Sequence, residues 1–576
     1  MHITRRQPAH HFELPDDMHP VLRRIYAARD IKSPAELDYS LQGLLPYASL
    51  LGMDRAVSLL AAALKKQKCI LIVADYDADG ATACALAMRG LTLMGFQDVH
   101  FFVPNRFEFG YGLSPEVVEA AAELGPDILV TVDNGIASVE GVALARKRNI
   151  EVLITDHHLP GTKLPEASAI VNPNQPGDPF PSKHLAGVGV MFYLLIALRS
   201  HLRGQKWFAR NKIPEPNLAD LLDLVALGTV ADVVPLDHNN RILVAQGLKR
   251  IRSGKCCAGI RELLKIANRS LPNVSAQDLS FAMAPRLNAA GRLTDMALGI
   301  ECLLTDDDGA AAEMTQALDQ LNRERREIQA EMQSQAMLDI ASFGLEGSSL
   351  PDGICLFNES WHQGVVGVLA GKIKDHLHRP AIVFAEDKDG CIRGSARSIH
   401  GVHIRDVLDT IANRHPGLIG KFGGHAMAAG LTIRKSDLEQ FRTRFNEVVT
   451  QFFPADHRQG TLYTDGELAA DDLGLELAEQ IAGAGPWGQG FPEPVFDGEF
   501  DLVKSRVVGE KHLKLELRTP DRNRKIGAIA FNVTDEDWPA SVERVQTVYR
   551  LDVNEYGGRR EVQLVIEHIA PLKNRD

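Results

Sequence analysis

The sequence predicts an α/β protein with two α/β lobes, a long connecting helix and a C-terminal barrel of β-strands. Three observations carry this prediction. Strand-like apolar runs alternate with helical patterns between about residues 46 and 250, and again between 347 and 455, as in mostly parallel sheets. A long helical pattern separates these two stretches. Short strand-like runs then dominate after residue 460.

Length and composition place the chain among ordinary globular proteins. It has 576 residues, 45% hydrophobic and 24% charged, with a formal net charge of −12. This acidic balance disfavours a general polyanion binder, so a nucleic-acid site would need locally concentrated positive charge or bound metal. The seven cysteines lack C-x-x-C spacing, and the sequence has neither an 18-residue apolar run nor a signal peptide. We therefore expect a cytoplasmic protein with reduced cysteines and no membrane contact.

The first candidate site is CILIVADYDADG, residues 69–80. A β-branched apolar run, typical of a buried strand, precedes a helix-forming segment, and we expect Gly80 to permit a tight turn between them. The run is followed at alternate positions by Asp75, Asp77 and Asp79. Three carboxylates at a strand end repel one another unless a cation lies between them, which indicates a divalent metal. An EF-hand loop is excluded, because its twelfth position holds Leu86 instead of Glu and because a strand precedes it.

Two further strand ends carry side chains that bind metals. The run 127–132 leads to Asp133 and a glycine-containing turn, and the run 152–155 leads to Asp156, His157 and His158. The carboxyl ends of parallel strands lie at one edge of a sheet, so we expect these side chains to converge. Singly, such an aspartate is usually a helix N-cap, and a histidine pair usually fills surface or core. Together, the three strand ends favour a metal site.

A fourth apolar segment, LVALGTVADVVPL over residues 224–236, contains Asp232. A buried aspartate is costly unless it is paired or bound to metal. By itself, Asp232 is equally well explained as a helix cap.

The segments DYDADG, VDNG, DHH and GTVADVVPL resemble, in this order, the four motifs of the DHH phosphoesterase superfamily. The triplet DHH alone is unspecific, whereas four motifs in order are highly specific. The resemblance covers nearly the whole chain and is strongest to the bacterial 5′→3′ exonucleases of this superfamily that degrade single-stranded DNA. It implies a hydrolase of DNA repair and recombination that uses two Mn²⁺ or Mg²⁺ ions per active site.

The resemblance also implies roles for individual residues. The metal ligands would be Asp77, Asp79, Asp133, His157 and Asp232. Asp75 and Asp156 would support these ligands or replace one of them, and His158 would contact the scissile phosphate. Some relatives with small substrates have a histidine ligand where this chain has Val73, so the first ion has a different coordination here.

The ligand types favour the same metals independently of the resemblance. Hard carboxylate oxygens with few imidazoles and no thiolate suit Mn²⁺ or Mg²⁺ better than structural zinc. Two such ions about 4 Å apart can deprotonate a water and stabilise the leaving oxygen. We therefore expect metal-hydroxide attack on a phosphodiester, without a covalent enzyme intermediate.

The segment FAMAPRLNAAGR, residues 281–292, resembles the PR-x-NA-x-GR segment of the superfamily. Arg286 and Asn288 are its candidate substrate contacts, although its arginines are equally suited to tie the two lobes together. A helix is predicted from Asp308 to Phe343, with a buried apolar stripe at helical spacing. We expect this helix to act as a connecting rod.

In the second lobe we expect strands at 354–357 and 381–385 and a helix at 364–374. The segment KFGGHAMAAG, residues 421–430, resembles the GGH-x-x-A-x-G loop of the DHH-associated domain. Its glycines would let backbone N–H groups approach a phosphate at a helix start, while the alternative is a glycine turn for close packing. The candidate substrate contacts in this lobe are Ser395, Arg397, Gly423, Gly424 and His425.

The tail contains five predicted strands, at 500–508, 512–518, 525–531, 547–554 and 561–568, with a hairpin turn at Tyr556-Gly557-Gly558. They suit an OB-like barrel, a fold that often binds single strands.

Nearer the expected metal site, the loop NRFEFGYG, residues 105–112, contains Arg106 and three aromatic residues. This loop either stacks a base or fills the interface between the lobes, and we favour substrate contact.

We expect an N-terminal segment of mixed helical pattern (1–45), a DHH catalytic domain (46–300), a connecting helix (301–346), a DHH-associated domain (347–455) and an OB-like nucleic-acid-binding domain (460–576). The leading hypothesis is a monomeric two-metal exonuclease on single-stranded DNA, with single-stranded-DNA-binding protein as a partner implied by the resemblance. One alternative is a DHH phosphodiesterase for small nucleotides or oligoribonucleotides, which would not need the barrel. Another is a nucleic-acid-binding protein without catalysis, which the intact carboxylate set disfavours.

Overall fold

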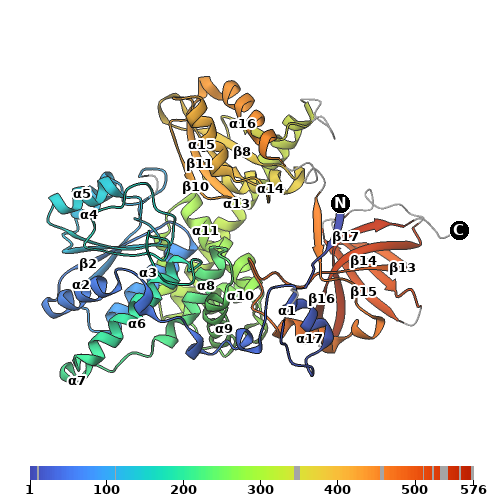
Figure 1. Cartoon of the computed structure of the whole chain (residues 1–576), viewed down its shortest axis with the longest axis horizontal. Coiled ribbons are helices and arrows are strands. Elements are labelled where there is room, and N and C mark those ends of the chain that lie inside the picture. The colour runs from blue at the N-terminus through green and yellow to red at the C-terminus, as the bar shows by residue number, and fades with distance from the viewer. Residues whose placement is uncertain are drawn as a thin grey trace.

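The computed structural model contains two α/β lobes, the long helix α13 and a separate β-barrel (Figure 1). It describes residues 1–576 except 9–11, 110–111, 343–349, 454–459, 510–511, 522–523, 532, 534–541, 557–558 and 573–576. Within the described residues, no single helix is long and apolar enough to cross a bilayer. One bent pair, residues 41–49 with 53–66, meets this test only when both parts are counted together.

A five-stranded parallel sheet forms the centre of the first lobe. Its strand order is β3(Val99–Phe102), β2(Ile70–Ala74), β4(Ile128–Val132), β5(Glu151–Thr155), β6(Ala169–Val171). Every residue of β2 and β4 is buried, because helices cover both faces, and this explains their continuous apolar runs. The core on one face includes α2(Met53–Lys66), α3(Ala78–Leu93) and α6(Gly187–Gly204), and the core on the other includes α4(Pro115–Ala122) and α5(Val139–Lys147).

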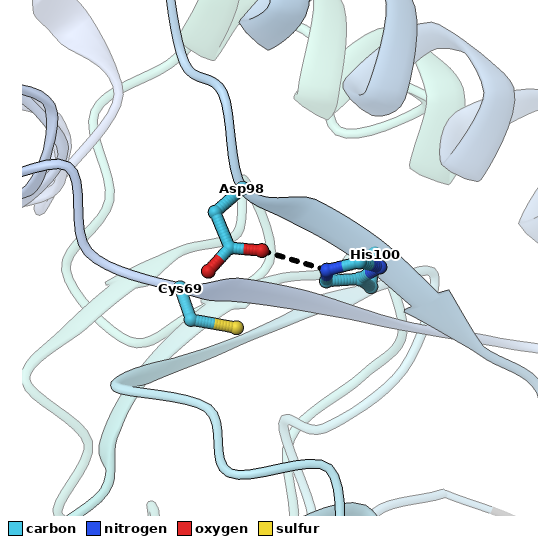
Figure 2. Close-up of side chains that lie close together, drawn as sticks. All are labelled: Cys69, Asp98 and His100. Atoms are coloured by element: carbon cyan, nitrogen blue, oxygen red, sulfur yellow. Dashed lines mark hydrogen bonds and ion pairs between the residues drawn. The ribbon is translucent and has the colours of Figure 1, made fainter.

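The sheet has polar clusters at both of its ends. At the amino end, the side chains of Cys69, Asp98 and His100 come together from the starts of β2 and β3 (Figure 2). At the carboxyl end lie the acidic motifs that the sequence singled out.

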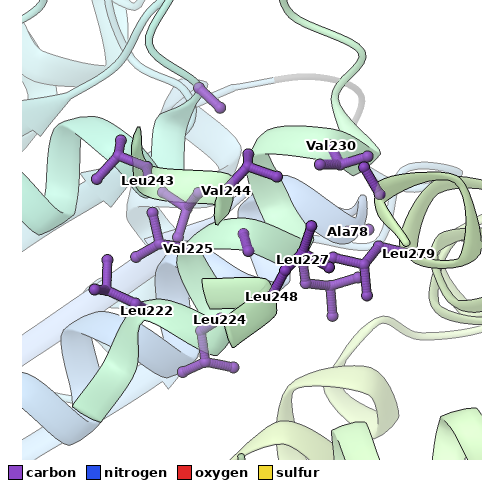
Figure 3. Packing of buried hydrophobic residues seen from close by; sticks show 14 of the residues in the cluster. Ala78, Leu222, Leu224, Val225, Leu227, Val230, Leu243, Val244, Leu248 and Leu279 are labelled. Carbon is purple, nitrogen blue, oxygen red and sulfur yellow. The ribbon is translucent and has the colours of Figure 1, made fainter. Parts of the chain in front are cut away.

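A layer of helices completes the first lobe. It contains α7(Trp207–Asn211), α8(Leu222–Ala231), α9(His238–Arg252), α10(Ala258–Ile266), a π-helical turn (Asp278–Met283), α11(Ala284–Leu293) and α12(Ala297–Leu304). Leu222, Val225 and Leu248 pack between α8 and α9, and Val230 and Leu279 lie beside Ala78 of α3 (Figure 3). This packing fixes the end of α8, at which Asp232 stands, against the start of α3.

The two lobes are connected by α13(Asp308–Ser342), which confirms the predicted long helix, whose last predicted residue, Phe343, lies outside the described residues. Its 35 residues span about 52 Å at 1.5 Å each. Leu318 belongs to the core of the first lobe, whereas Met332 and Ile340 belong to a core of the second. The helix is therefore part of both lobes and sets their separation.

The second lobe has a five-stranded mixed sheet in the order β10(Lys421–Gly424), β11(Ala428–Arg434), β9(Cys391–Arg397), β8(Ala381–Glu386), β7(Ile354–Phe357). Its helices are α14(Val366–Leu377), α15(Ile404–Arg414) and α16(Leu438–Phe452). The expected glycine loop at a helix start is wrong, because β10 and β11 pair as an antiparallel hairpin with Gly424 opposite Ala429. Glycine and alanine have low strand propensity, so local pattern carried little sign of these strands.

The C-terminal region confirms the predicted barrel. It is closed in the order β13(Phe496–Val508), β14(His512–Arg518), β15(Lys525–Phe531), β17(Arg559–Pro571), β16(Arg544–Tyr556). All neighbours are antiparallel except β15 and β17, which pair in parallel. The predicted turn residues Gly557 and Gly558 lie outside the described residues.

The N-terminal segment contains short helices, as expected, and in addition a strand. Its first strand, β1(His2–Arg5), pairs in parallel with β12(Thr461–Thr464), which precedes the barrel together with α17(Leu475–Gly483). The helix α1(Pro20–Ala27) stacks Tyr26 on Trp487 and Phe491. A buried ion pair at 2.8 Å, Arg29 with Asp465, fixes this contact. The two ends of the chain therefore form one unit, which no local pattern could predict.

Candidate active site

The structure brings the predicted metal-binding side chains together at the carboxyl end of the first sheet. They are Asp75, Asp77, Asp79, Asp133, Asp156, His157, His158 and Asp232. His157 Nε2 lies 3.0 Å from Asp133 Oδ1 and 3.4 Å from Asp232 Oδ2. These residues come from three strand ends and from the C-terminus of α8, so the predicted convergence in space is observed.

The backbone positions these carboxylates in two ways. Asp77 is the N-cap of α3, and its Oδ1 accepts a hydrogen bond of 3.0 Å from Gly80 N. Gly80 itself lies within the helix, and a Cβ there would stand 2.5 Å from Asp75 O, so close approach and not the expected turn requires glycine. Asp133 has a φ of +64°, a strained conformation for a non-glycine residue, of the kind that clusters at functional sites.

Asp79 is held by the start of a helix that the sequence analysis did not connect with the site. Its carboxylate accepts hydrogen bonds from Gly187 N (2.6 Å) and Val188 N (2.9 Å) at the N-terminus of α6. A Cβ on Gly187 would approach Asp133 Cβ to 2.6 Å, and a Cβ on Gly228 would approach Asp79 Oδ1 to 2.9 Å. The two glycines thus let α6 and α8 approach the carboxylates. In the sequence, the available signal for this contact was a glycine at the start of an apolar helix.

Asp156 acts as an acceptor that orients the histidine pair. Its Oδ1 accepts from the backbone N–H groups of His157 and His158 and lies 2.8 Å from His158 Nδ1, while Oδ2 accepts from Ile136 N. Burial acts to raise the pKa of Asp156, but the hydrogen bond and charge of His158 outweigh it and lower the pKa to about 2. Burial acts to lower the pKa of His158, but the hydrogen bond to Asp156 outweighs burial and raises this pKa to about 9.

The remaining carboxyl groups repel one another in a buried place. Burial, followed by the charge of Asp232, raises the pKa of Asp79 to about 7, and burial with the charge of Asp77 raises that of Asp232 to about 8. Burial and neighbouring aspartates also raise the pKa values of Asp75 and Asp133 well above the usual range. Deprotonated together at neutral pH, these groups need a compensating cation.

The donor atoms form groups that fit divalent metals. In two of the groups the ligand atoms lie within 4.8 Å of one another: Asp75, Asp77 and Asp133 in the first, and Asp79, His157 and Asp232 in the second. The buried His157 Nε2 makes no hydrogen bond with the residues that the structure describes, although it faces carboxylate oxygens. Oxygen donors with one imidazole suit Mn²⁺ or Mg²⁺, so the residues present fit this type of ion.

The second lobe reaches this cluster through the β10–β11 hairpin. The His425 ring stacks on His158 with 5.7 Å between the ring centroids. Beside this contact, Phe107 of the aromatic loop packs edge-on against His362 of the second lobe, with ring centroids 5.8 Å apart. Arg292 donates a hydrogen bond of 3.1 Å to Gly364 O. The candidate site thus lies between the two lobes.

Three arginines gather beside the carboxylates without acidic partners among the described residues: Arg106, Arg292 and Arg397. Arg106 lies over the ring of Tyr76, 4.7 Å from its centroid, and Arg397 donates to Ser395 Oγ and Ala396 O of its own strand. Burial, followed by the charges of Arg106 and Arg397, lowers the pKa of Arg292 to about 10. These guanidinium ions lie near the carboxylates, since the charge of Asp77 acts to raise the pKa of Arg292 and the charge of Arg106 acts to lower that of Asp75. Guanidinium groups gathered in this way are suited to bind phosphate.

Arg286 and Asn288 lie in a different environment. Arg286 forms a buried ion pair of 2.8 Å with Asp319 of α13 and donates to Ala282 O. Asn288 Oδ1 accepts a hydrogen bond of 2.8 Å from Ala78 N at the start of α3. These contacts favour the role of tying helices together, which the sequence left open beside phosphate contact.

Comparison with known proteins identifies the family. Three family profiles match in order: "DHH family, N-terminal domain" over residues 69–229, "DHHA1 domain" over 351–451 and "RecJ OB domain" over 464–568. The chain is 52% identical over 569 residues to the single-stranded-DNA-specific exonuclease RecJ of Dickeya dadantii, and 49% identical over 571 residues to that of Escherichia coli. Each alignment covers 99% of both chains. The chain belongs to the RecJ family.

Solved structures of this family share the fold. RecJ from Thermus thermophilus in complex with Mn²⁺ matches with a TM-score of 0.79 and 29% identity, covering 96% of this chain and 76% of that one. The complex of the same RecJ with Mg²⁺ matches with a TM-score of 0.73 and 27% identity, covering 96% and 75%. The predicted fold class of two α/β lobes, a connecting helix and an OB-like barrel is therefore confirmed.

Proposed function

We propose that this chain is a metal-dependent exonuclease that hydrolyses single-stranded DNA from the 5′ end, in DNA repair and recombination. The buried carboxylate and histidine cluster between the lobes, with three arginines beside it that form no ion pair with the described residues, is the observation that carries the proposal. The full-length similarity to single-stranded-DNA-specific exonucleases supports the substrate class. The alternative of a phosphodiesterase for small nucleotides or oligoribonucleotides is not favoured, because the chain contains a barrel that such a substrate would not need.

We assign two Mn²⁺ or Mg²⁺ ions to this site. Asp75, Asp77 and Asp133 would hold one, and Asp79, His157 and Asp232 the other, with Asp133 next to both groups. When bound, such ions lower the pKa of a water and stabilise the leaving oxygen of the scissile bond. The protein contributes fixed ligand positions, which the N-terminus of α6, the cap at Asp77 and the strained turn at Asp133 provide.

The residues around the metal ligands would bind the DNA backbone. Asp156 holds His158 in a cationic state at neutral pH, since the pKa of His158 is about 9, and His158 can donate a hydrogen bond to the scissile phosphate. His425 stacks on His158 from the other lobe and lies in reach of the same phosphate. Arg106, Arg397 and Arg292 would bind neighbouring phosphates, with Ser395, Gly423 and Gly424 in the adjoining strands.

The position of the site between two lobes suggests why a single strand is preferred. The contacts of Phe107 with His362 and of Arg292 with Gly364 bridge the lobes next to the cluster and restrict its width. A single strand can thread such a passage, whereas a duplex, which is several times thicker, cannot without separation of its strands. The barrel would extend the binding track for the strand.

Further assignments rest on the family resemblance. We propose that the protein acts as a monomer in the cytoplasm and cooperates with single-stranded-DNA-binding protein. We also propose functional units at residues 46–300, 301–346, 347–455 and 460–576. Of residues 1–45, β1 and α1 pack on the last unit, whereas residues 36–45 contact α9 of the first.

The experiment uses single- and double-stranded DNA labelled at either end, with Mn²⁺, with Mg²⁺ or with a chelator. We expect 5′-terminal products from single strands with either ion and none with the chelator. Equal degradation of blunt duplex would contradict the narrow passage, and release from the 3′ end would contradict the polarity. Binding of DNA without hydrolysis under all metal conditions would instead identify a binding protein.

A further inference from the structure

A second cluster of metal-ligating side chains lies at the amino end of the first sheet. Cys69 stands directly before β2, and Asp98 and His100 flank Val99 at the start of β3 (Figure 2). Six residue steps separate Cys69 from Asp75, which corresponds to roughly 20 Å at about 3.3 Å per residue. The cluster is therefore distinct from the carboxylates at the other end of the strand.

The strand register places these three side chains on one face. Ile70 pairs with Val99 in the parallel ladder, so Cys69 is level with Asp98, and the strand alternation points Asp98 and His100 to the same side. His100 Nε2 lies 2.7 Å from Asp98 Oδ1. One ligand atom from each residue lies within 4.8 Å of the other two, so a single cation can reach all three.

The backbone around the cluster is rigid and carries a further acidic residue. Cys69 N donates a hydrogen bond of 2.9 Å to Asp127 Oδ2, and Ile70 N donates to Asp98 O. Two carboxylates thus lie close to the thiol, and the strand starts that hold the ligands are fixed by the sheet. Asp98 and His100 remain open to solvent, with side-chain exposures of 48% and 62%, so an ion can enter.

A nucleophilic cysteine is the competing explanation for a Cys, His and Asp group, and the contacts disfavour it. A nucleophile needs histidine to activate the thiol. Here His100 Nε2 lies 2.7 Å from Asp98 Oδ1, so this nitrogen is engaged by the carboxylate and does not activate the thiol.

We propose that Cys69, Asp98 and His100 form a binding site for a thiophilic divalent cation of the zinc class, with water as the fourth ligand. Sulfur, nitrogen and oxygen from three residues with one open position is a ligand set that zinc accepts, whereas Mg²⁺ and Mn²⁺ disfavour thiolate. On binding, the Cys69 thiol loses its proton to solvent and the metal–sulfur bond forms, with no change in oxidation state. The bound ion would link β2 and β3 at the edge of the sheet.

Cobalt titration of the full-length, phosphine-reduced protein tests this proposal, because thiolate bound to Co²⁺ gives a charge-transfer band in the near-ultraviolet. We expect one equivalent of this band, its loss in Cys69→Ser and binding about tenfold weaker or more in His100→Ala. Two controls should keep the band: Cys391→Ser, which removes another partly exposed cysteine outside this cluster, and Asp133→Asn, which disrupts only the carboxylate cluster.

A second measurement, of thermal unfolding, does not depend on the cobalt spectrum. Zn²⁺ should raise the thermal unfolding midpoint of Asp133→Asn, and this increase should become smaller when Cys69→Ser is added, because Asp79, His157 and Asp232 still offer another group of ligands. Absence of the band in the unaltered protein, or its persistence in Cys69→Ser, would overturn the proposal. Because these readouts do not involve DNA, they are independent of the nuclease assignment.

Discussion

At the two ends of β2, side chains that can bind metals lie in opposite environments. At the carboxyl end, Asp75, Asp79 and Asp133 are 7%, 1% and 1% exposed, and their pKa values are raised. At the amino end, the side chains of Asp98 and His100 are about half exposed. Burial removes the water that would otherwise solvate the charges, so only the carboxyl end requires a cation for charge balance. At the amino end, the chemical type of the ligands must instead determine which cation binds.

The largest expected effect comes from removing one buried charge. Asp133→Asn should lower the rate of DNA cleavage by about 10³-fold or more, because Asp133 belongs to one ligand group and its carboxylate lies 3.0 Å from His157 of the other. Asparagine tolerates the left-handed backbone at this position, so the fold should persist. Without metal, the variant should unfold at a higher temperature than the unaltered protein, since one repulsive charge is absent. Cleavage within tenfold of normal would contradict the assignment, and end-labelled DNA and thermal unfolding in chelator provide the measurements.

A substitution of Arg286 tests whether this arginine stabilises the fold or binds the substrate. Arg286→Leu leaves the buried Asp319 with Arg323 as its remaining ion-pair partner and should lower the free energy of unfolding by about 2 kcal/mol. Cleavage per folded molecule should stay unchanged. Denaturant unfolding and single-turnover cleavage test both statements, with Arg148→Ala, which removes an exposed ion pair to Glu119, as the control. Normal stability with lost DNA binding would instead assign Arg286 to the phosphate track.

Arg106 should have a smaller effect, on binding alone. Arg106→Ala should weaken binding of single-stranded DNA about tenfold or more, because one charge-assisted phosphate contact is lost. Hydrolysis of a mononucleotide ester should be preserved, since the metal ligands are unchanged. Binding titrations at two salt concentrations, with Arg148→Ala for comparison, measure this loss. Unchanged binding would mean that the aromatic loop fills the interface between the lobes, through its contact with His362, and does not bind the substrate.

The smallest expected effect is a dependence of stability on pH that metal removes. In the folded chain the pKa values of Asp79 and Asp232 are about 7 and 8, above their usual value near 3.8. Folding therefore takes up protons, so without metal these groups destabilise the protein increasingly as the pH rises from about 4 to about 8. Mn²⁺ should raise the unfolding midpoint more at pH 8 than at pH 6. Equal increases of the unfolding midpoint at both pH values would mean that Asp79 and Asp232 are already ionised at pH 6 in the metal-free protein.

The sequence was sufficient where local pattern and chemistry coincide. Apolar runs that end in acidic residues predicted the first sheet, and the order of its strand ends predicted that Asp79, Asp133 and His157 converge. Alternation predicted the barrel strands, of which His512–Arg518 and Lys525–Phe531 have the predicted bounds. In each case the signal lies within a few neighbouring residues.

The sequence was insufficient where a contact joins distant segments. The hydrogen bonds from Gly187 and Val188 to Asp79 connect residues more than a hundred positions apart, and the glycine at the start of an apolar helix does not indicate which residue it contacts. The hairpin that presents His425 is built from glycine and alanine, whose pairing partners, and not their own propensity, make them strands. The grouping of Arg292 with Arg106 and Arg397 likewise exists only in space.

The pairing of β1 with β12 has a consequence for how the chain is made. His2 is aligned with Thr461, so β1 leaves the ribosome well before β12 and finds its neighbour only after more than 450 further residues have been synthesised. During translation, the N-terminal residues must wait while both lobes fold. A nascent chain that stops before residue 461 exposes an unpaired strand edge, which makes incomplete products good targets for chaperones and proteases.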